Sequence, residues 1–245
     1  MVHRFHTEVS LTGGLISLSR GETQHLIASR VKAGDGIFIF DGNGLEYSAI
    51  VMELSKNGAI LQMGLCQESG CELPFELTVG CPLPKGDREQ FLLEKLTEVG
   101  VSRFVPLRTA RSVIHPQPHR LERLRRHVIE ASKQCGRNQL MQILPLAHID
   151  EYINGPWCLS QELWLGHVPE ISEPDWCFPT QNMSVGKKNV AIAIGPEGGW
   201  TAEEVDHASQ SGWRLCSLGR RKLRLETAAI LLAYQAVQRF EGIVD

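Results

Sequence analysis

Apolar and polar positions are most regular near the C-terminal end of the chain. An apolar run over 190–194 predicts a buried strand, and it stops at 195–199, a segment with three glycines. Thr201 and Glu204 then have the spacing of a capping box, so a helix is expected to begin there. A second strand over 214–218 also ends at a glycine, before a last helix. By itself, the glycine segment fits a ligand loop and a tight strand-to-helix turn equally well.

Strands and helices also alternate in the preceding part of the chain. Apolar residues at helical spacing follow Asp87, a good N-cap residue, and Gly100 ends that pattern. The expected strands are 75–83, 101–107, 141–146 and 162–165, and the expected helices are 87–99 and 119–135. This alternation predicts an α/β fold with a largely parallel sheet and crossover helices. In such sheets, ligands bind at the carboxyl ends of the strands.

The first part of the chain has a different pattern, in which short strands are separated by turns. The expected elements are a helix at 21–31 and strands at 36–40, 46–54 and 59–66. Residues 67–74 are polar and contain glycine and proline, which is typical of a domain boundary. We therefore predict a small β-barrel domain at 1–72 and an α/β domain at 73–245.

Composition is that of an ordinary globular protein, with 42% hydrophobic and 22% charged residues. No apolar run approaches the roughly 20 residues that span a bilayer, and the first residues contain no signal-peptide core. The seven cysteines include no C-x-x-C pair, which argues against a disulfide framework and a zinc site. We expect a cytoplasmic protein without a bound metal or a membrane partner.

Charge is distributed unevenly along a chain whose net charge is −3. Residues 103–137 contain nine lysines and arginines against two acids, and 214–224 contain five basic residues and no acid. Residues 138–186 contain six acids and no lysine or arginine. This segregation predicts a local basic surface for a nucleic acid, unless the arginines are dispersed in space among partners.

The wording of several segments is more specific than their pattern. IGPEGGWTAEEVD (194–206), followed by LGRRKLRLETAA (218–229), resembles the C-terminal signature of the RsmE family. LPKGDREQFLLEKLTEVGVSRFVPL (83–107), EASKQCGR (130–137) and RVKAGDGIFIFDGNG (30–44) resemble further segments of that family. The resemblance covers nearly the whole chain.

RsmE proteins are SPOUT-superfamily methyltransferases that use S-adenosylmethionine to methylate N3 of a uridine in small-subunit (16S) ribosomal RNA. The resemblance therefore implies S-adenosylmethionine as the cofactor, and small-subunit ribosomal RNA or the 30S particle as the partner. It also implies a PUA-like RNA-binding barrel at 1–72 and a SPOUT domain at 73–245. The chain after about Glu162 would form a deep trefoil knot, and two subunits would form a homodimer.

The resemblance also assigns residues to the expected site. Three strand-end loops would bind the cofactor through Leu165, Gly166, Ile194, Gly195, Pro196, Glu197, Gly198, Gly199, Leu218, Gly219 and Leu223. The expected catalytic or substrate-orienting residues are Arg224 and Glu226, and the expected RNA contacts are Arg30, Lys85 and Arg137. Other interpretations stay open. Leu218 and Leu223 also fit a core, and Arg224 and Glu226 also fit a structural ion pair.

Three positions depart from the family pattern. Lys222 stands where an apolar residue is usual, Leu225 where a threonine is usual, and Lys133 where an acid is usual. None is a glycine of the expected loops, so cofactor binding is still expected, whereas Leu225 bears on the substrate geometry. Two other functions stay open: another SPOUT reaction, such as ribose 2′-O methylation, and a ribosome-assembly RNA-binding protein without catalysis. The intact glycine loops favour an enzyme.

Overall fold

The computed structural model describes residues 3–9, 11, 13–68, 70–112, 118–159, 162–168 and 189–240. Its contacts divide the chain into two compact units. The N-terminal unit consists of Met1–Glu72 with Ile129–Leu140, and the C-terminal unit consists of Leu73–Val128 with Met141–Asp245. One division of the chain follows residue 72, and residues 129–140 join the N-terminal unit, which no pattern in the chain indicates.

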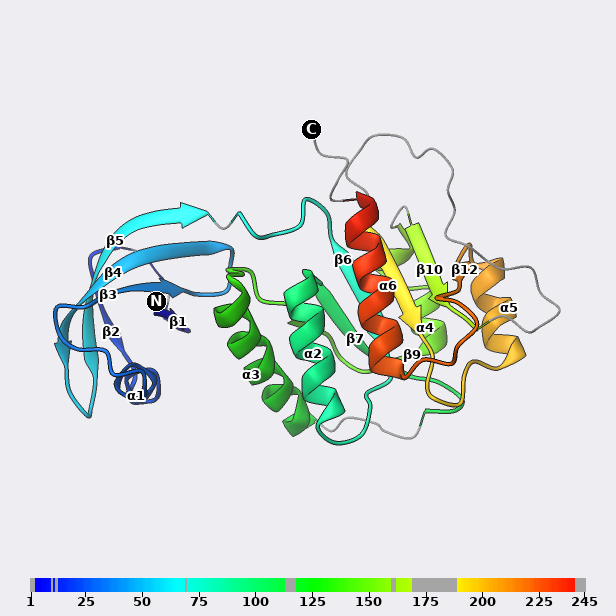
Figure 1. The fold of residues 1–245 in the computed structure, drawn as a ribbon, viewed down its shortest axis with the longest axis horizontal. Helices are drawn as coiled ribbons and strands as arrows, with labels where there is room; N and C mark the ends of the chain where they lie inside the picture. Colours follow the sequence, from blue (N-terminus) through cyan, green and yellow to red (C-terminus); the bar gives the residue numbers. More distant parts are fainter. Residues whose placement is uncertain are drawn as a thin grey trace. The chain divides into compact units, whose positions relative to one another are not determined.

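The N-terminal unit contains a curved five-stranded sheet in the order β1-β3-β4-β5-β2 (Figure 1). Its strands are β1 (Arg4–His6), β2 (Leu15–Leu18), β3 (Gly36–Phe40), β4 (Leu45–Leu54) and β5 (Ala59–Glu68). The strands predicted at 36–40, 46–54 and 59–66 are confirmed as β3, β4 and β5, which pair antiparallel in succession. Leu26, Ile39 and Leu61 are fully buried in the core of this unit. Strands β1 and β2 have only three and four residues, too few for an alternating pattern to be recognised.

Helix α1 (Arg20–Ala28) begins after a capping box formed by Ser19 and Glu22. The Ser19 hydroxyl accepts a hydrogen bond from the Glu22 amide, and the Glu22 carboxylate accepts one from the Ser19 amide. Arg30 has a φ of +60°, a left-handed conformation in which a helix cannot continue. The predicted helix at 21–31 is therefore too long at its C-terminal end.

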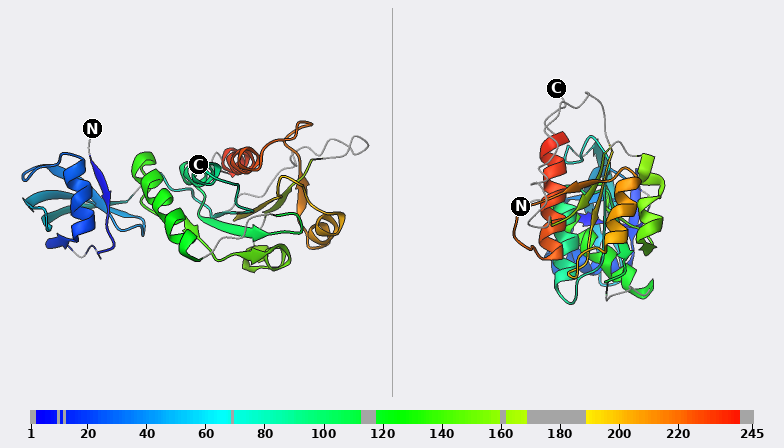
Figure 2. Two further views of the ribbon diagram at one scale, coloured as in Figure 1. Left: turned by 90° about the horizontal axis from the view of Figure 1, so that it is seen from below. Right: turned by 90° about the vertical axis from the view of Figure 1, so that its right-hand side faces the viewer.

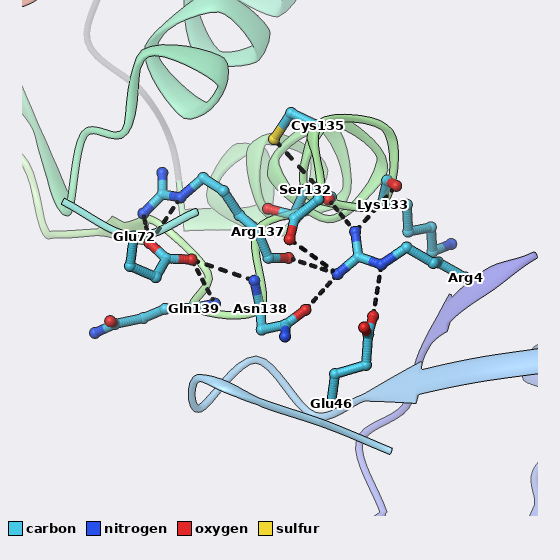
Figure 3. A network of polar contacts seen from close by, with 10 residues as sticks. Arg4, Glu46, Glu72, Ser132, Lys133, Cys135, Arg137, Asn138 and Gln139 are labelled. Carbon is cyan, nitrogen blue, oxygen red and sulfur yellow. Dashed lines mark hydrogen bonds and ion pairs between the residues drawn. The ribbon is translucent and has the colours of Figure 1, made fainter. Parts of the chain in front are cut away.

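Arg4 fastens strand β1 to residues 129–140 of the same unit (Figure 3). Its guanidinium donates hydrogen bonds to the carbonyls of Ser132 (3.0 Å) and Gly136 (3.2 Å), at the C-terminal end of helix α3 (Pro118–Cys135). It also pairs with Glu46 at 2.6 Å and contacts the side-chain oxygen of Asn138. A cation at this end of a helix stabilises carbonyls that lack intrahelical partners.

Arg137 belongs to the same polar network and is only 3% exposed (Figure 3). Its guanidinium pairs with Glu72 at 2.9 Å, and Glu72 also accepts hydrogen bonds from the backbone amides of Asn138 and Gln139. The charge of Arg137 is therefore buried and paired. This position gives no support to the RNA contact predicted for Arg137, and it makes the residue part of the framework of the N-terminal unit.

The C-terminal unit contains a parallel sheet in the order β12-β10-β11-β6-β7-β8, and β9 also pairs with β7. Its strands are β6 (Leu77–Cys81), β7 (Arg103–Arg108), β8 (Gln142–Ile143), β9 (Ala147–His148), β10 (Glu162–Gly166), β11 (Val190–Ile194) and β12 (Arg214–Cys216). The predicted parallel α/β sheet is confirmed. Strand β11 is fully buried and lies between β10 and β6, so the chain returns to the middle of the sheet after β10.

Helices cover both faces of this sheet. Helices α2 (Arg88–Val99) and α6 (Leu225–Phe240) pack together on one face, and α4 (Ile149–Ile153) and α5 (Ala202–Gln210) lie on the other (Figure 2). Thr201 and Glu204 form the predicted capping box of α5, and Gly100 ends α2 in a left-handed conformation. The prediction for Asp87 is wrong in one respect, because its side chain makes no capping hydrogen bond to α2.

Replacing Arg4 by alanine should lower the free energy of unfolding by about 1.5–3 kcal/mol, because Glu46 and the carbonyls at the end of α3 lose the charged donor of several part-buried hydrogen bonds. Urea unfolding followed by circular dichroism measures the loss. The matched control is Arg103→Ala, which removes a solvent-exposed pair with Glu76 and should cost less than about 1 kcal/mol. Equal losses for the two variants would contradict the special role of Arg4.

Candidate functional site

Three loops follow the carboxyl ends of neighbouring strands in the C-terminal sheet. Strand β10 lies between β11 and β12, and Gly166 stands opposite Ile194 on one side and Cys216 on the other. Because these strands are parallel, all three loops begin at carboxyl ends, where ligands bind in open α/β sheets. The three glycine-containing loops therefore begin at neighbouring strand ends.

Two different constraints account for the glycines of these loops. A Cβ atom at Gly166 would lie 2.6 Å from Cδ1 of Ile194, and one at Gly195 would lie 3.0 Å from the indole ring of Trp200. Side chains are therefore excluded there by close packing. Gly199 and Gly219 instead have φ angles of +70° and +100°, which glycine adopts without strain.

Trp200 joins two of the loops. Its indole N–H donates a hydrogen bond to the carbonyl of Gly166 at 2.9 Å, and its ring packs against Gly195. The side chain is 9% exposed and belongs to a core cluster that includes Leu165 and Ala193. Nothing in the periodicity of the chain singles out this residue. The sequence feature that could have identified Trp200 is its position directly after the GPEGG segment.

The apolar residues predicted to bind the cofactor differ in exposure. Leu165 and Ile194 are 1% and 3% exposed, so their side chains belong to the core. Leu218 and Leu223, which follow β12, are half-buried. Part of their apolar surface therefore stays accessible.

A buried carboxylate lies at the start of α6. Glu226 is 4% exposed, and its Oε2 accepts no hydrogen bond from any described residue. Nη1 of Arg88, the first residue of α2, lies 3.7 Å from this oxygen and 3.5 Å from Oε1 of Glu197 in the GPEGG segment. The helix N-terminus also favours negative charge at this position. A buried acceptor of this kind is available to an N–H group of a ligand.

Glu226 forms an ion pair with Arg88 and not with Arg224. The side chain of Arg224 is exposed, and its backbone carbonyl accepts a hydrogen bond from the amide of Ala228 at 2.9 Å. The alternative interpretation of Arg224 and Glu226 as a structural pair is therefore wrong for the described residues. Sequence reasoning also missed Arg88, since its partners are far away along the chain.

Two cysteines end strands of the sheet near these loops. Burial raises the pKa of the Cys81 thiol far above its usual range, and the negative charge of Glu226 raises it further. Burial likewise raises the pKa of Cys216 to about 12. Both side chains stay protonated at neutral pH, and a protonated thiol is a poor nucleophile. Neither pKa favours the thiolate that covalent chemistry would need.

Most basic residues of the segment 103–137 have acidic partners. Arg120 and Arg123 both pair with Glu89, which is 1% exposed. Further pairs are Arg103 with Glu76, Lys133 with Glu130 and Arg137 with Glu72. The basic surface predicted for this segment is therefore smaller than the charge count suggests, since internal pairs use much of the charge.

Exposed cations remain next to the loops. Arg221, Lys222 and Arg224 follow β12, and all three side chains are exposed. Of the other predicted RNA contacts, Lys85 is exposed in the segment after β6, and Arg30 is exposed in the N-terminal unit. These positions leave their charges accessible to an anionic partner.

Within the described ranges, no group of three or more His, Cys, Asp and Glu side chains could hold a metal ion. None of the helices in the part of the chain that the structure describes has the length and hydropathy needed to cross a membrane.

Replacing Gly166 by alanine should destabilise the protein by about 1–3 kcal/mol, because the new methyl group meets Cδ1 of Ile194. Ile194→Val removes that atom, so the double variant should be nearly as stable as Ile194→Val alone. Thermal unfolding of the four proteins measures the coupling between the two positions. If the double variant loses as much stability as the two single variants together, the expected contact between the new methyl group and Ile194 is wrong.

Comparison with known proteins places this site in a family. A family model described as "RNA methyltransferase domain" matches residues 71–238. Ribosomal RNA small subunit methyltransferase E from Synechocystis sp. is 32% identical over 202 residues, which cover 81% of this chain. The match spans 64% of that relative, somewhat less than two thirds of its length.

Solved structures match over a larger part of the chain. A ribosomal RNA small subunit methyltransferase E from Neisseria gonorrhoeae, bound to S-adenosyl methionine, is 29% identical with a TM-score of 0.85, and 98% of each chain is covered. A putative methyltransferase from Legionella pneumophila, in complex with SAM, is 26% identical with a TM-score of 0.86 and the same coverage. The chain belongs to the ribosomal RNA small subunit methyltransferase E family.

Proposed function

We propose that this protein is an S-adenosylmethionine-dependent methyltransferase of small-subunit ribosomal RNA. One observation carries the proposal: the loops after β10, β11 and β12 leave one edge of the sheet side by side, and buried Glu226 begins the helix that follows the third loop. Membership of the family supports it, because relatives are named for this activity and two similar structures hold the cofactor.

The loops have features that suit S-adenosylmethionine. Residues 195–199 and Gly219 can bring peptide groups close to a ligand, because few side chains intervene. Half-buried Leu218 and Leu223 offer apolar surface for adenine, while Leu165 and Gly166 would contribute backbone atoms. Bound there, the cofactor supplies an activated methyl group, and the protein has to align the acceptor with it.

The finer proposal is that the acceptor is N3 of a uridine in 16S ribosomal RNA. N3 lies on the Watson–Crick edge of the base and carries a proton, so the base must be unstacked and the proton removed. Glu226 is suited to accept this proton, because its buried Oε2 has no donor among the described residues. Arg224 is exposed close by in sequence and would bind a uracil oxygen, which favours the anionic ring.

RNA binding would involve both units, each described by itself. The curved antiparallel sheet of the N-terminal unit supports a PUA-like RNA-binding barrel, with Arg30 as an exposed contact. In the C-terminal unit, Lys85 and the exposed cations after β12 would bind phosphates. Phosphate contacts make affinity depend steeply on salt, so an affinity for RNA that does not change with salt would contradict this part of the proposal.

A trefoil knot belongs to the same proposal. Strand β11 enters the sheet between β10 and β6, and a chain that forms a knot needs such an insertion. The segment 169–188, which joins β10 to β11, lies outside the described residues. An experimental trace of that segment decides between a threaded and an unthreaded path.

We also propose that two copies of the chain form a homodimer. Phe91 on α2 and Leu231 and Tyr234 on α6 are exposed, although the two helices pack together. Exposed apolar side chains on adjacent helices are typical of a self-complementary contact in a symmetric dimer. This contact would cover the helices on the side away from the sheet.

Methylation of 30S particles from cells that lack the protein tests the function. The wild-type protein should introduce one methylated uridine, which mass spectrometry of the RNA can locate. Glu226→Gln should lower kcat by about 100-fold or more, because the proton acceptor is lost, while calorimetry should show nearly unchanged affinity for S-adenosylmethionine. The control is Glu203→Gln, at an exposed position on α5.

The two levels of this proposal fail separately. If the wild-type protein methylates no uridine in the particle, the proposed reaction is wrong. If Glu226→Gln and the wild type have equal rates, the reaction stands and Glu226 is not the proton acceptor.

The double variant Leu231→Glu, Tyr234→Glu should convert a dimer into a monomer, because charges replace apolar side chains in the contact. Light scattering after size-exclusion chromatography measures the mass. Leu65→Glu, at an exposed position on β5, is the matched control and should stay dimeric. A wild-type protein that runs as a monomer would contradict the proposed contact.

A further inference from the structure

Arg111 contacts the glycine-containing loop that follows β11. Arg111 itself follows β7, a strand that supplies none of the three loops described above. It lies just after β7, and its Nη1 donates hydrogen bonds to the carbonyls of Gly198 (2.8 Å) and Trp200 (3.1 Å). Its side chain also lies close over the loop, since a Cβ atom at Gly198 would be 3.3 Å from Cβ of Arg111. Strand β6 separates β7 from β11, so this side chain reaches across the end of β6.

A second bond joins the same two segments, and here the segment after β11 supplies the side chain. Oε1 of Glu204 accepts a hydrogen bond from the amide of Ala110 at 2.9 Å, while Oε2 of Glu204 accepts one from the amide of Thr201 at 2.9 Å. Glu204 is 9% exposed, so both bonds are largely shielded from water. The segment after β7 and the segment after β11 are therefore held at two points.

The turn that carries Arg111 has hydrogen bonds of its own. The amide of Thr109 donates to the Ser112 hydroxyl at 3.0 Å, and that hydroxyl donates to the Thr109 carbonyl at 3.0 Å. Arg111 therefore lies in a turn that these two hydrogen bonds stabilise. Arg111 binds the backbone carbonyl of Trp200, and the indole N–H of Trp200 in turn donates a hydrogen bond to the carbonyl of Gly166.

We propose that Arg111 is a positioning residue for the cofactor, and this rests on the proposed function of the loops. Its guanidinium binds the carbonyls of Gly198 and Trp200 and so fixes the orientation of the peptide groups in 195–199 before the cofactor arrives. Through Trp200, the same contact fixes the loop after β10. The cofactor site then depends on four strand ends, with β7 as the additional one.

A different role for an exposed arginine beside this site is contact with an RNA phosphate. The two roles differ in which substrate they affect. A positioning residue for the loop changes the KM for S-adenosylmethionine, whereas a phosphate contact changes the KM for RNA and the dependence of RNA binding on salt. The carbonyl bonds at 2.8 and 3.1 Å favour the first role.

The experiment compares Arg111→Ala and Arg111→Lys with Arg108→Ala, an exposed arginine at the end of the same strand. Calorimetry gives the Kd for S-adenosylmethionine, and methylation of 30S particles gives kcat and both KM values. Arg111→Ala should raise the Kd and KM for S-adenosylmethionine about tenfold, with kcat and the KM for RNA changed less than about twofold. Arg111→Lys should recover part of the loss, since an ammonium group can keep one of the bonds, and Arg108→Ala should resemble the wild type.

The contrary results are distinct. A raised KM for RNA with unchanged affinity for S-adenosylmethionine would overturn the proposal and make Arg111 an RNA contact. Equal losses in all parameters together with a large fall in melting temperature of Arg111→Lys would overturn it in favour of a purely structural role. A wild-type protein without affinity for S-adenosylmethionine would instead refute the proposed function on which the inference rests.

Discussion

The parallel pairing of β10 with β11 on one side and β12 on the other is the constraint on which the site depends. It brings Gly166, Ile194 and Cys216 level with one another, so the loops that follow must begin side by side. The amide of His167 continues the pairing beyond β10 by donating to the carbonyl of Cys216 at 2.9 Å. A shift of one residue in this register would reverse the side chains of β10 and separate the glycines from their close contacts.

Paired internal charges make up much of the remaining framework. Glu89 pairs with two arginines of α3, and Arg4 binds the carbonyls at the other end of that helix. Buried charges are tolerated in proteins when they have such partners, and removing one partner is costly. Glu226 differs from Glu89, because one of its buried oxygens has only the distant contact with Arg88 among the described residues. That difference separates a structural carboxylate from one that is suited to receive a ligand.

The sequence predicts well those features that depend on residues close to one another along the chain. The capping box of Thr201 and Glu204 and the left-handed Gly100 depend on residues within one helical turn, so their patterns are sufficient. Contacts between distant segments have no such signature. Arg88 on α2 meets Glu226 on α6, far away along the chain, and Trp200 after β11 meets Gly166 at the end of the neighbouring strand β10. For the same reason, segment 130–137 indicates a family motif but not the burial of its arginine. Short elements such as β1 and α4 also escape recognition, because they contain too few residues for a period.

Hydrogen–deuterium exchange with and without S-adenosylmethionine is the most direct test of the claim that three strand ends form one cofactor site. The account predicts that exchange slows together at residues 166–168, 195–199 and 217–224, with little change in strands β3 to β5 of the N-terminal unit. Protection confined to one of the three segments, or found mainly in the N-terminal unit, would contradict it.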